Sequence, residues 1–420
     1  MNAIINIFLM DISHASNTSG VDRYMGTLIG GLRDFANIRV HWIHFTDDKF
    51  LLYPKEETIG HYIKFSIPLP QYYDAILAER YWNRKYDEQV YRLTKHLFWG
   101  KENVIIHLHT LNLIDLAVYI REREKCKIIT HLHCIPWKGL YNKDKKRFNR
   151  LYELTYTKVG DKEKPTPQMY VTNYCEFQSY SEPDALICVT KCAVDFLKNC
   201  IHSYSDNIFV IPNGIEDYNR GSSKRKSKSP PDHFHCLYVG VLSESKGIGY
   251  ILESLRIVQQ QGYNVSLSIA GACRQSFSHK LKNDYPDLNI EIKGLIPLEE
   301  LKKLYTECDM GIIASLQEQA SYVAIEMAMF GMPIVMTAVD GLDEMFTDEV
   351  NALKVNTVFS PVFGLSVDIS EMAKQIIRII NDYKLRNHLC KNARKLYEEK
   401  FNHRLMMNRT VDVYKQTTQI

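Results

Sequence analysis

The sequence predicts an α/β protein built from two Rossmann-like domains. Short apolar segments alternate with segments of helical period along the whole 420-residue chain. Segments that are apolar on both faces are typical of parallel strands that helices cover on either side of a sheet. The chain is also too long for one ordinary hydrophobic core and long enough for two. The alternation therefore predicts an open, doubly wound parallel sheet in each half.

The first half begins with a strand. Its apolar start ends at Asp11 and lacks the basic region and small-residue cleavage site of a signal peptide. A helix follows, with Val21, Met25, Leu28, Leu32 and Phe35 on one face. The expected strands of this half are 4–9, 39–45, 104–108, 127–132, 185–189 and 208–211.

Two other segments of the first half fit this scheme less well. Residues 75–99 show a helical pattern with Tyr86, Val90, Leu93 and Leu97 on one face, whereas Arg80, Arg84, Lys85, Arg92 and Lys95 lie elsewhere. This segment is either a solvated outer helix or a docking face for an acidic or lipid-linked acceptor. Residues 160–167 are polar and contain proline, which favours a loop.

A break in composition marks the boundary between the two halves. After Pro212-Asn213-Gly214, residues 220–231 are rich in Ser, Lys, Gly and Pro and have no periodicity. The alternation then restarts, with expected strands at 236–241, 265–270, 290–293, 310–314 and 333–337. We therefore expect one domain over 1–215 and a second over 216–403. Because ligands of such sheets lie beyond the carboxyl ends of the strands, the chemistry is expected in a cleft between the domains.

The bulk composition excludes several classes of protein. A net charge of +3, with 45% hydrophobic and 24% charged residues, is ordinary for a globular protein and argues against a nucleic-acid partner. The basic run 224–228 favours a solvated loop over an anion-binding surface. The ten cysteines are dispersed, which indicates reduced thiols that are buried as small apolar side chains in a cytoplasmic protein. No segment approaches the ~20 apolar residues of a membrane span, so any contact with the inner face of a membrane is expected to be peripheral.

Two glutamates form the most informative motif. Glu318 and Glu326 are separated by seven residues, the first before a predicted helix and the second inside it. One carboxylate accepts two hydroxyl hydrogen bonds, so a vicinal diol of a sugar is a natural partner. Ser321 is a candidate cap for this helix, whose N-terminus would then face an anion. The spacing alone is weak, because acidic residues are common near helix starts.

The residues around the motif resemble family-four retaining glycosyltransferases, which have the two-domain GT-B fold. The E-x7-E motif is followed by Gly331-Met332-Pro333, as in the family. Further ordered matches are 211–215, the phosphate-binding segment 238–248, the base-binding segment 292–297, and 301–311. Asn392-Ala393-Arg394 and Phe401 resemble the C-terminal helices of the family, and residues 404–420 resemble its helix that returns to the first domain.

The resemblance implies a role for each matching residue of the second half. Glu326 would bind the ribose hydroxyls of a nucleotide, Glu318 the hydroxyls of the transferred sugar, and Lys246 the diphosphate. The other donor-binding residues implied on this side are Asn213, Gly214, Gly294, Leu295, Ser321, Tyr322 and Val323. Gly294 and Leu295 would hold the base through backbone groups.

The first half would add a glycine turn and a histidine. Gly20, in Ser19-Gly20-Val21, resembles the turn whose N–H groups contact the diphosphate. His133, which follows a predicted strand in Thr130-His131-Leu132-His133, resembles the histidine beside the donor sugar. His131 is its rival for this role, and His109 ends the preceding strand pattern.

The chain departs from the family pattern in two places. Val241 stands where relatives commonly have an arginine that contacts the diphosphate, and Arg274 is the candidate replacement. Gln319-Ala320-Ser321 replaces a glycine-rich turn after the first glutamate, so the identity of the sugar cannot be transferred from relatives.

The resemblance implies transfer of a hexose-type sugar with retention of anomeric configuration. Catalysis would involve Glu318, His133 and Lys246, and the acceptor would be a glycan or a lipid-linked molecule of glycoconjugate biosynthesis. Because no Asp-x-Asp occurs, neither a metal site nor a cofactor is expected, and Lys246 and helix N-termini would stabilise the leaving diphosphate. Two alternatives remain: a nucleotide-sugar epimerase, and a non-catalytic subunit of this fold that binds a nucleotide or a glycan.

Overall fold

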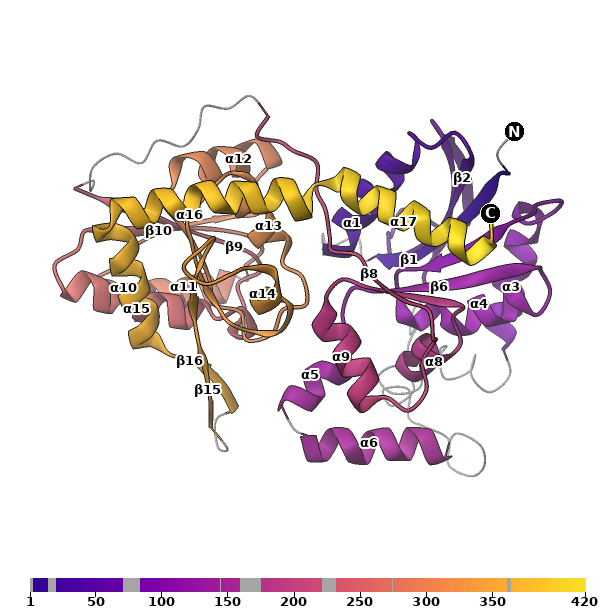
Figure 1. Ribbon diagram of the computed structural model, residues 1–420, viewed down its shortest axis with the longest axis horizontal. Coiled ribbons are helices and arrows are strands. Elements are labelled where there is room, and N and C mark those ends of the chain that lie inside the picture. Colours follow the sequence, from indigo (N-terminus) through magenta and orange to yellow (C-terminus); the bar gives the residue numbers. More distant parts are fainter. Residues whose placement is uncertain are drawn as a thin grey trace. The chain divides into compact units, whose positions relative to one another are not determined.

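The chain folds into two compact α/β units (Figure 1). The computed structural model describes residues 3–13, 20–70, 84–143, 145–158, 175–220, 232–273, 275–360 and 364–420. One unit contains residues up to Asn213 together with His403–Ile420, and the other contains Gly214–Asn402. The sequence-based boundaries were placed after residues 215 and 403. The predicted fold class is confirmed, including the return of the C-terminal helix to the first unit.

The first unit is built on an eight-stranded sheet with the order β3-β4-β2-β1-β5-β6-β7-β8. Its strands are β1 (Ile5–Ser13), β2 (Ile38–Thr46), β3 (Lys55–Ile59), β4 (Tyr62–Pro68), β5 (Val104–Leu108), β6 (Cys126–Leu132), β7 (Ala185–Cys188) and β8 (Ile208–Val210). Its helices are α1 (Gly20–Leu32), α3 (Lys85–Thr94), α4 (Ile114–Arg121), α5 (Pro136–Lys143), α6 (Lys145–Lys158), α8 (Cys175–Ser181), α9 (Lys191–Cys200) and α17 (His403–Thr418). All strand pairs are parallel except β3–β4.

Burial explains why these segments form the predicted elements. All five residues of β5 are buried, as expected for a strand covered on both faces. Helix α1 turns Tyr24, Met25 and Leu28 toward the core. It packs against α17 at Gly31, where an added Cβ would lie 2.7 Å from Met407 Cγ. Glycine at this position therefore allows the C-terminal helix to pack closely on the first unit.

The second unit has a six-stranded parallel sheet with the order β11-β10-β9-β12-β13-β14. Its strands are β9 (Phe234–Val239), β10 (Val265–Ala270), β11 (Asn289–Gly294), β12 (Met310–Ile313), β13 (Ile334–Thr337) and β14 (Leu353–Val355), and a separate hairpin is formed by β15 (Thr357–Ser360) and β16 (Gly364–Val367). Its helices are α10 (Ile248–Gln260), α11 (Gln275–Asp284), α12 (Leu298–Glu307), α13 (Tyr322–Met329), α14 (Asp340–Met345), α15 (Ile369–Asn381) and α16 (Tyr383–Leu396).

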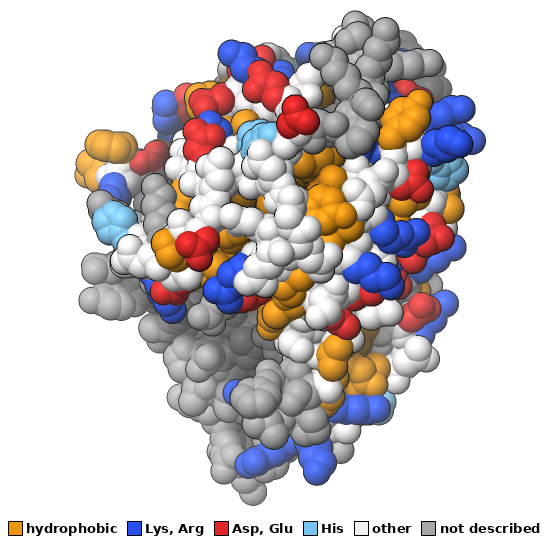
Figure 2. Space-filling view, turned by 90° about the vertical axis from the view of Figure 1, so that its left-hand side faces the viewer, with side chains coloured by type: hydrophobic (Ala, Val, Ile, Leu, Met, Phe, Trp, Pro, Cys, Tyr) orange, Lys and Arg blue, Asp and Glu red, His pale blue; other side chains and the backbone are white. Residues whose placement is uncertain are grey.

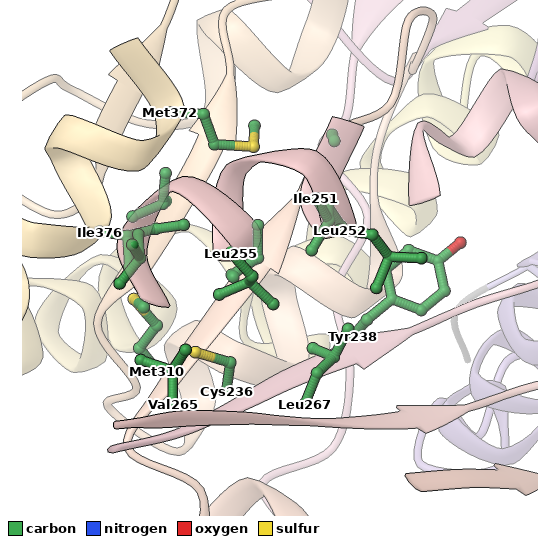
Figure 3. Close-up of a cluster of buried hydrophobic side chains, with 14 of the residues drawn as sticks. Cys236, Tyr238, Ile251, Leu252, Leu255, Val265, Leu267, Met310, Met372 and Ile376 are labelled. Carbon is green, nitrogen blue, oxygen red and sulfur yellow. The ribbon is translucent and has the colours of Figure 1, made fainter. Parts of the chain in front are cut away.

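Figure 3 shows the core of the second unit between its sheet and two helices. Cys236, Leu267 and Met310 project from β9, β10 and β12 toward Leu255 of α10 and Ile376 of α15, and all five are at most 2% exposed. Burying such side chains stabilises the fold by roughly 1.5–3 kcal/mol each for the larger ones. This core fixes the strand ends from which the site residues project.

The structure corrects several expectations about individual segments. Strand β1 continues past Asp11 to Ser13, because the Asp11 carboxylate accepts hydrogen bonds from Trp42 Nε1 at 2.6 Å and His44 Nδ1 at 2.9 Å within the sheet. The β3–β4 hairpin was not predicted, since the KEETI sequence of β3 is mostly exposed and carries no apolar pattern.

Further corrections concern exposure. Leu93, expected on an apolar helix face, is 44% exposed. Of the predicted segment 75–99 the structure describes 84–99, where α3 is followed by a 3-10 turn at Lys95–Leu97. Cys134 is exposed rather than buried, although all ten cysteines are free thiols. Other expectations concern residues outside the described parts of the chain, namely 71–83, 160–167, 224–228 and Arg274.

Neither a membrane span nor a face of a single charge is found in what the structure describes and Figure 2 draws. Within the described part of the chain, no helix is long and apolar enough to cross a bilayer. Figure 2 shows basic and acidic side chains intermixed on the face that it draws.

A buried glutamate makes the stability of the first unit depend on pH. Glu176 of α8 is 1% exposed and accepts hydrogen bonds from the Trp137 N–H, at 2.8 Å, and from the Tyr180 hydroxyl. Burial raises the pKa of Glu176 to about 8, despite these two hydrogen bonds. Between pH 4.5 and 8, Glu176 therefore keeps its proton in the folded state, whereas in the unfolded chain the carboxyl group, with its ordinary pKa of 4.5, has released it.

We expect the free energy of unfolding to fall as the pH rises from 4.5 toward 8, by about 1.4 kcal/mol per pH unit at most from this group. Glu176→Gln should remove this slope, because glutamine keeps an acceptor and does not ionise. Urea unfolding at several pH values checks this result. Glu88→Gln is the control, because Glu88 lies on α3 with 45% of its side chain exposed. An unchanged slope in Glu176→Gln would show that another group is responsible.

Candidate active site

The candidate site of the second unit lies where its strand order reverses. Strands β9 and β12 are neighbours, whereas the chain proceeds outward from β9 through β10 to β11 and from β12 through β13 to β14. Open α/β sheets bind ligands beyond the carboxyl ends of their strands at such a switch point. Lys246 follows β9, and Glu318 and Glu326 follow β12. The topology therefore brings together the charged residues that were selected from the sequence.

Glu326 is held inside helix α13 by a tyrosine. Its side chain is 4% exposed, and its Oε2 accepts a hydrogen bond of 2.6 Å from the Tyr305 hydroxyl. Tyr305, on α12, stacks on Phe330 with 5.2 Å between ring centroids. The hydrogen bond from Tyr305 to Oε2 therefore orients the Glu326 carboxylate. Tyr305 was not selected from the sequence, although it lies in the 301–311 segment of the resemblance.

The start of α13 is defined by its predicted cap. Ser321 has extended backbone geometry, and its Oγ accepts a hydrogen bond of 3.2 Å from the Ala324 N–H. This confirms the predicted capping role and places Tyr322 and Val323 in the first turn. The end of the helix is fixed by Arg394, which donates to the Met329 carbonyl at 2.7 Å and to the Asp217 carboxylate at 2.6 and 3.0 Å.

Glu318 and Lys246 form an ion pair across the switch point. Lys246 Nζ lies 2.6 Å from Glu318 Oε2, and their side chains are 38% and 17% exposed. The backbone reinforces this pairing, because the Leu316 N–H donates to the Ser245 carbonyl at 3.1 Å. The ion pair therefore places one cation and one carboxylate side by side beyond the ends of β9 and β12.

Gln319 is a further polar residue of this loop. Its side chain is 6% exposed, and neither its amide nitrogen nor its amide oxygen has a hydrogen-bond partner among the described residues. A buried amide without partners is costly, which makes it a candidate for contact with a polar ligand. The sequence indicated Gln319 only as a departure from the family turn.

A glycine turn fixes the position of Lys246. Gly247 has a φ of 72°, and an added Cβ would lie 2.0 Å from the Ala314 carbonyl oxygen. Only glycine fits this left-handed conformation against the end of β12.

We therefore expect Gly247→Ala to lower the melting temperature and to weaken binding of a nucleoside diphosphate, because Lys246 must shift. Differential scanning fluorimetry and titration calorimetry measure the two effects. Gly249→Ala is the matched control, since its added Cβ meets nothing within 4 Å. Equal behaviour of the two variants would show that the turn is not constrained as described.

The proposed base-binding residues lie at the outer strand of this sheet. Gly294 ends β11 with a φ of 68°, and its carbonyl already accepts a hydrogen bond of 2.8 Å from the Gly271 N–H. Leu295 is 71% exposed, and Val241, beyond β9, is 56% exposed. Two exposed apolar side chains therefore lie near the ends of these strands, and the Gly294 carbonyl is already hydrogen-bonded within the second unit.

The other predicted donor-binding residues lie at or before the boundary of the two units. Asn213 is 4% exposed, and its Oδ1 has no hydrogen-bond partner in the described part of the chain. Gly214 is the first residue of the second unit. Gly20 is the first residue of α1, and residues 14–19 before it are outside the described residues.

The predicted histidine belongs to a cluster in the first unit. His133 Nε2 lies 3.0 Å from His109 Nδ1, and its ring stacks on that of His131 with centroids 4.2 Å apart. His133 is partly exposed, whereas His131 is 1% exposed, so His133 is the better placed of the two rivals to meet a ligand. Burial lowers the pKa of His133 to about 3, so that it is neutral near pH 7.

Comparison with known proteins assigns both halves of the chain to glycosyltransferases. Residues 219–396 match the family profile "Glycosyl transferases group 1", and residues 18–217 match "Glycosyltransferase Family 4". An uncharacterized glycosyltransferase of Methanocaldococcus jannaschii is 27% identical over 257 residues, which are 57% of this chain and 62% of that protein. A capsular polysaccharide biosynthesis glycosyltransferase of Staphylococcus aureus is 26% identical over 44% of this chain and 46% of its own length.

Solved structures show the same fold. Sucrose-phosphate synthase from Thermosynechococcus elongatus superposes with a TM-score of 0.72 over 98% of both chains, at 20% identity. Anabaena HepE, in complex with UDP-glucose, superposes with a TM-score of 0.64 over 98% of this chain and all of that chain, at 14% identity. Both family profiles and the shared fold lead to one assignment: the chain belongs to the group 1 glycosyltransferases, which have the two-domain GT-B fold.

Proposed function

We propose that the protein transfers a hexose-type sugar from a nucleoside-diphosphate donor to a glycan or lipid-linked acceptor, with retention of anomeric configuration and without a metal ion. The observation that carries this proposal is the arrangement at the switch point of the second unit. There, one lysine and two oriented carboxylates lie beyond neighbouring strand ends. Such a set matches the charges of a diphosphate and the hydroxyls of ribose and sugar.

Each charged residue has one role in the proposed reaction. Glu326, oriented by Tyr305, binds the ribose hydroxyls. Lys246 leaves its ion pair with Glu318 to stabilise the diphosphate, whose negative charge grows as the glycosidic bond breaks. Glu318 is then available to accept hydrogen bonds from the sugar, beside the amide of Gln319. Because Lys246 takes the diphosphate charge and the chain has no Asp-x-Asp, a metal clamp is not needed.

His133 of the first unit supports the donor sugar in this proposal. A neutral imidazole accepts or donates a hydrogen bond without adding a charge, and burial keeps His133 neutral. The acceptor proton passes to the departing phosphate oxygen on the same face of the sugar, so no enzyme nucleophile is required. The staphylococcal relative named for capsular polysaccharide biosynthesis favours an acceptor used in polysaccharide assembly.

A screen of nucleotide sugars tests the proposal. UDP-glucose comes first, because HepE was solved with it. We expect slow release of a nucleoside diphosphate from one donor without added Mg²⁺ or Mn²⁺, and loss of this release in Glu318→Gln. Binding of a donor with no turnover under any acceptor mixture would favour the non-catalytic subunit instead. A change of the sugar without release of nucleotide would favour the epimerase.

A further inference from the structure

A cluster of four histidines lies on one face of the first sheet. His107 lies in β5 and His109 directly follows that strand, and His131 lies in β6 and His133 directly follows it. The ring centroids of His107 and His109 are 4.2 Å apart, and that of His131 is 5.5 Å from each of them. Of these four histidines, only His133 has a role in the proposed reaction.

The hydrogen bonds of this cluster leave a specific set of nitrogens unused. Nδ1 of His107 is 2.8 Å from the Tyr414 hydroxyl of α17, and Nδ1 of His109 is 3.0 Å from Nε2 of His133. Nε2 of His107, Nε2 of His109 and both ring nitrogens of His131 have no partner among the residues that the structure describes. The three rings are at most 4% exposed.

We propose that His107, His109 and His131 bind a divalent transition-metal ion of the zinc class. One ring nitrogen from each lies within 4.8 Å of the others, and all three are buried. Neutral imidazoles are preferred ligands of Zn²⁺, Co²⁺ and Ni²⁺, and buried polar atoms without partners call for an unseen water or ion. In a tetrahedral site with Zn–N bonds of about 2.1 Å, ligand nitrogens lie roughly 3.4 Å apart, so modest ring rotations would close the site.

The pattern of used and unused nitrogens supports this proposal. Metal-binding histidines usually hold their second ring nitrogen in a hydrogen bond, which fixes the ring and its tautomer. Tyr414 does this for His107, and His133 does it for His109. A ring nitrogen without a partner is not by itself evidence of a metal site. Both ring nitrogens of buried His41 also lack a partner among the described residues, yet His41 stacks on Phe8 and belongs to no group of candidate metal ligands found there.

The ion would connect the fold to the proposed reaction. It would join β5 to β6 and, through Tyr414, to the returning helix α17. If His109 binds through Nε2, its Nδ1 carries the proton and donates to His133 Nε2. His133 would then be fixed with its remaining proton on Nδ1, which makes it a donor toward a ligand. This second step rests on the proposed function, whereas metal binding itself does not.

Cobalt binding tests the site with a readout independent of activity. After treatment with EDTA and removal of the chelator, we expect the full chain to bind one equivalent of Co²⁺ with visible absorption bands, and excess Zn²⁺ to displace it. His131→Gln and His107→Gln should each lose the bands and the rise in melting temperature with Zn²⁺. His41→Gln, which removes a buried histidine outside the cluster, should retain both.

Two results would overturn the proposal. One is a wild-type protein that neither binds Co²⁺ nor gains thermal stability from Zn²⁺, in which case the rings are stacked core side chains against Tyr24. The other is unchanged Co²⁺ absorption in a folded His131→Gln variant. If both cluster variants fail to fold, the wild-type cobalt spectrum still decides, because three imidazole ligands give bands that hydrated Co²⁺ lacks. Donor binding in the second unit would be unaffected by either result.

Discussion

Lys246→Ala should cause the largest loss of function of any single change in the second unit. Lys246 is the cation paired with Glu318 at the switch point, and Val241, which lies just beyond β9, adds no second positive charge there. A hydrogen bond to a charged group contributes about 1.5–3 kcal/mol, or roughly 10- to 150-fold in affinity. Losing a preformed charge aimed at the leaving group costs about 10²–10³-fold in turnover.

Calorimetric titration with a nucleoside diphosphate and a donor-release assay measure the two effects of Lys246→Ala. Lys303→Ala, on the exposed side of α12, is the matched control and should bind normally. Removing Lys246 also leaves Glu318 without its cation, so the double variant with Glu318→Gln separates the two causes. If diphosphate affinity is unchanged in both variants, the phosphates do not lie beside β9 and β12.

Substitution of the two glutamates of the motif should affect different steps, turnover for Glu318 and nucleotide binding for Glu326. Glu318→Gln should mainly lower kcat, by about 10²-fold or more, because it removes a charged acceptor next to the transferred sugar. Glu326→Gln should mainly raise the Kd for the nucleotide, because it weakens the free energy of binding by about 1.5–3 kcal/mol. Tyr305→Phe should produce a smaller change in the same direction as Glu326→Gln, since it only releases one carboxylate oxygen.

Steady-state kinetics and nucleotide titrations distinguish these two roles. Glu299→Gln is the control, because Glu299 lies on α12 with 80% of its side chain exposed. A Glu318 variant that binds nucleotide poorly but turns over normally would reverse the assignment. Wild-type behaviour of both variants would remove the motif from the site.

The sequence predicted the parts of the fold that burial dictates. Strand β5 is apolar except for His107 and was predicted with its exact bounds, because parallel strands are buried on both faces. The cap at Ser321 followed from local helix chemistry. Strand β3 was not predicted, because it lies at the edge of the sheet and none of its five residues is buried.

The same limit applies to the site. Lys246, Glu318 and Glu326 were selected because a motif marks them. The Tyr305–Glu326 hydrogen bond joins residues of two helices, and the histidine cluster joins neighbouring strands of a sheet. Such contacts depend on strand order and helix packing, which local sequence patterns do not encode. His131 could have been weighed with His107 and His109 as a cluster only after β5 and β6 were known to be neighbours.

Hydrogen–deuterium exchange with a nucleoside diphosphate locates the donor site without any substitution. We expect the diphosphate identified in the donor screen to slow exchange most in peptides that contain 244–248, 294–297 and 318–326. These peptides surround the carboxyl ends of β9, β11 and β12. Protection confined to the first unit, or to the hairpin β15–β16, with none at 318–326, would contradict the account.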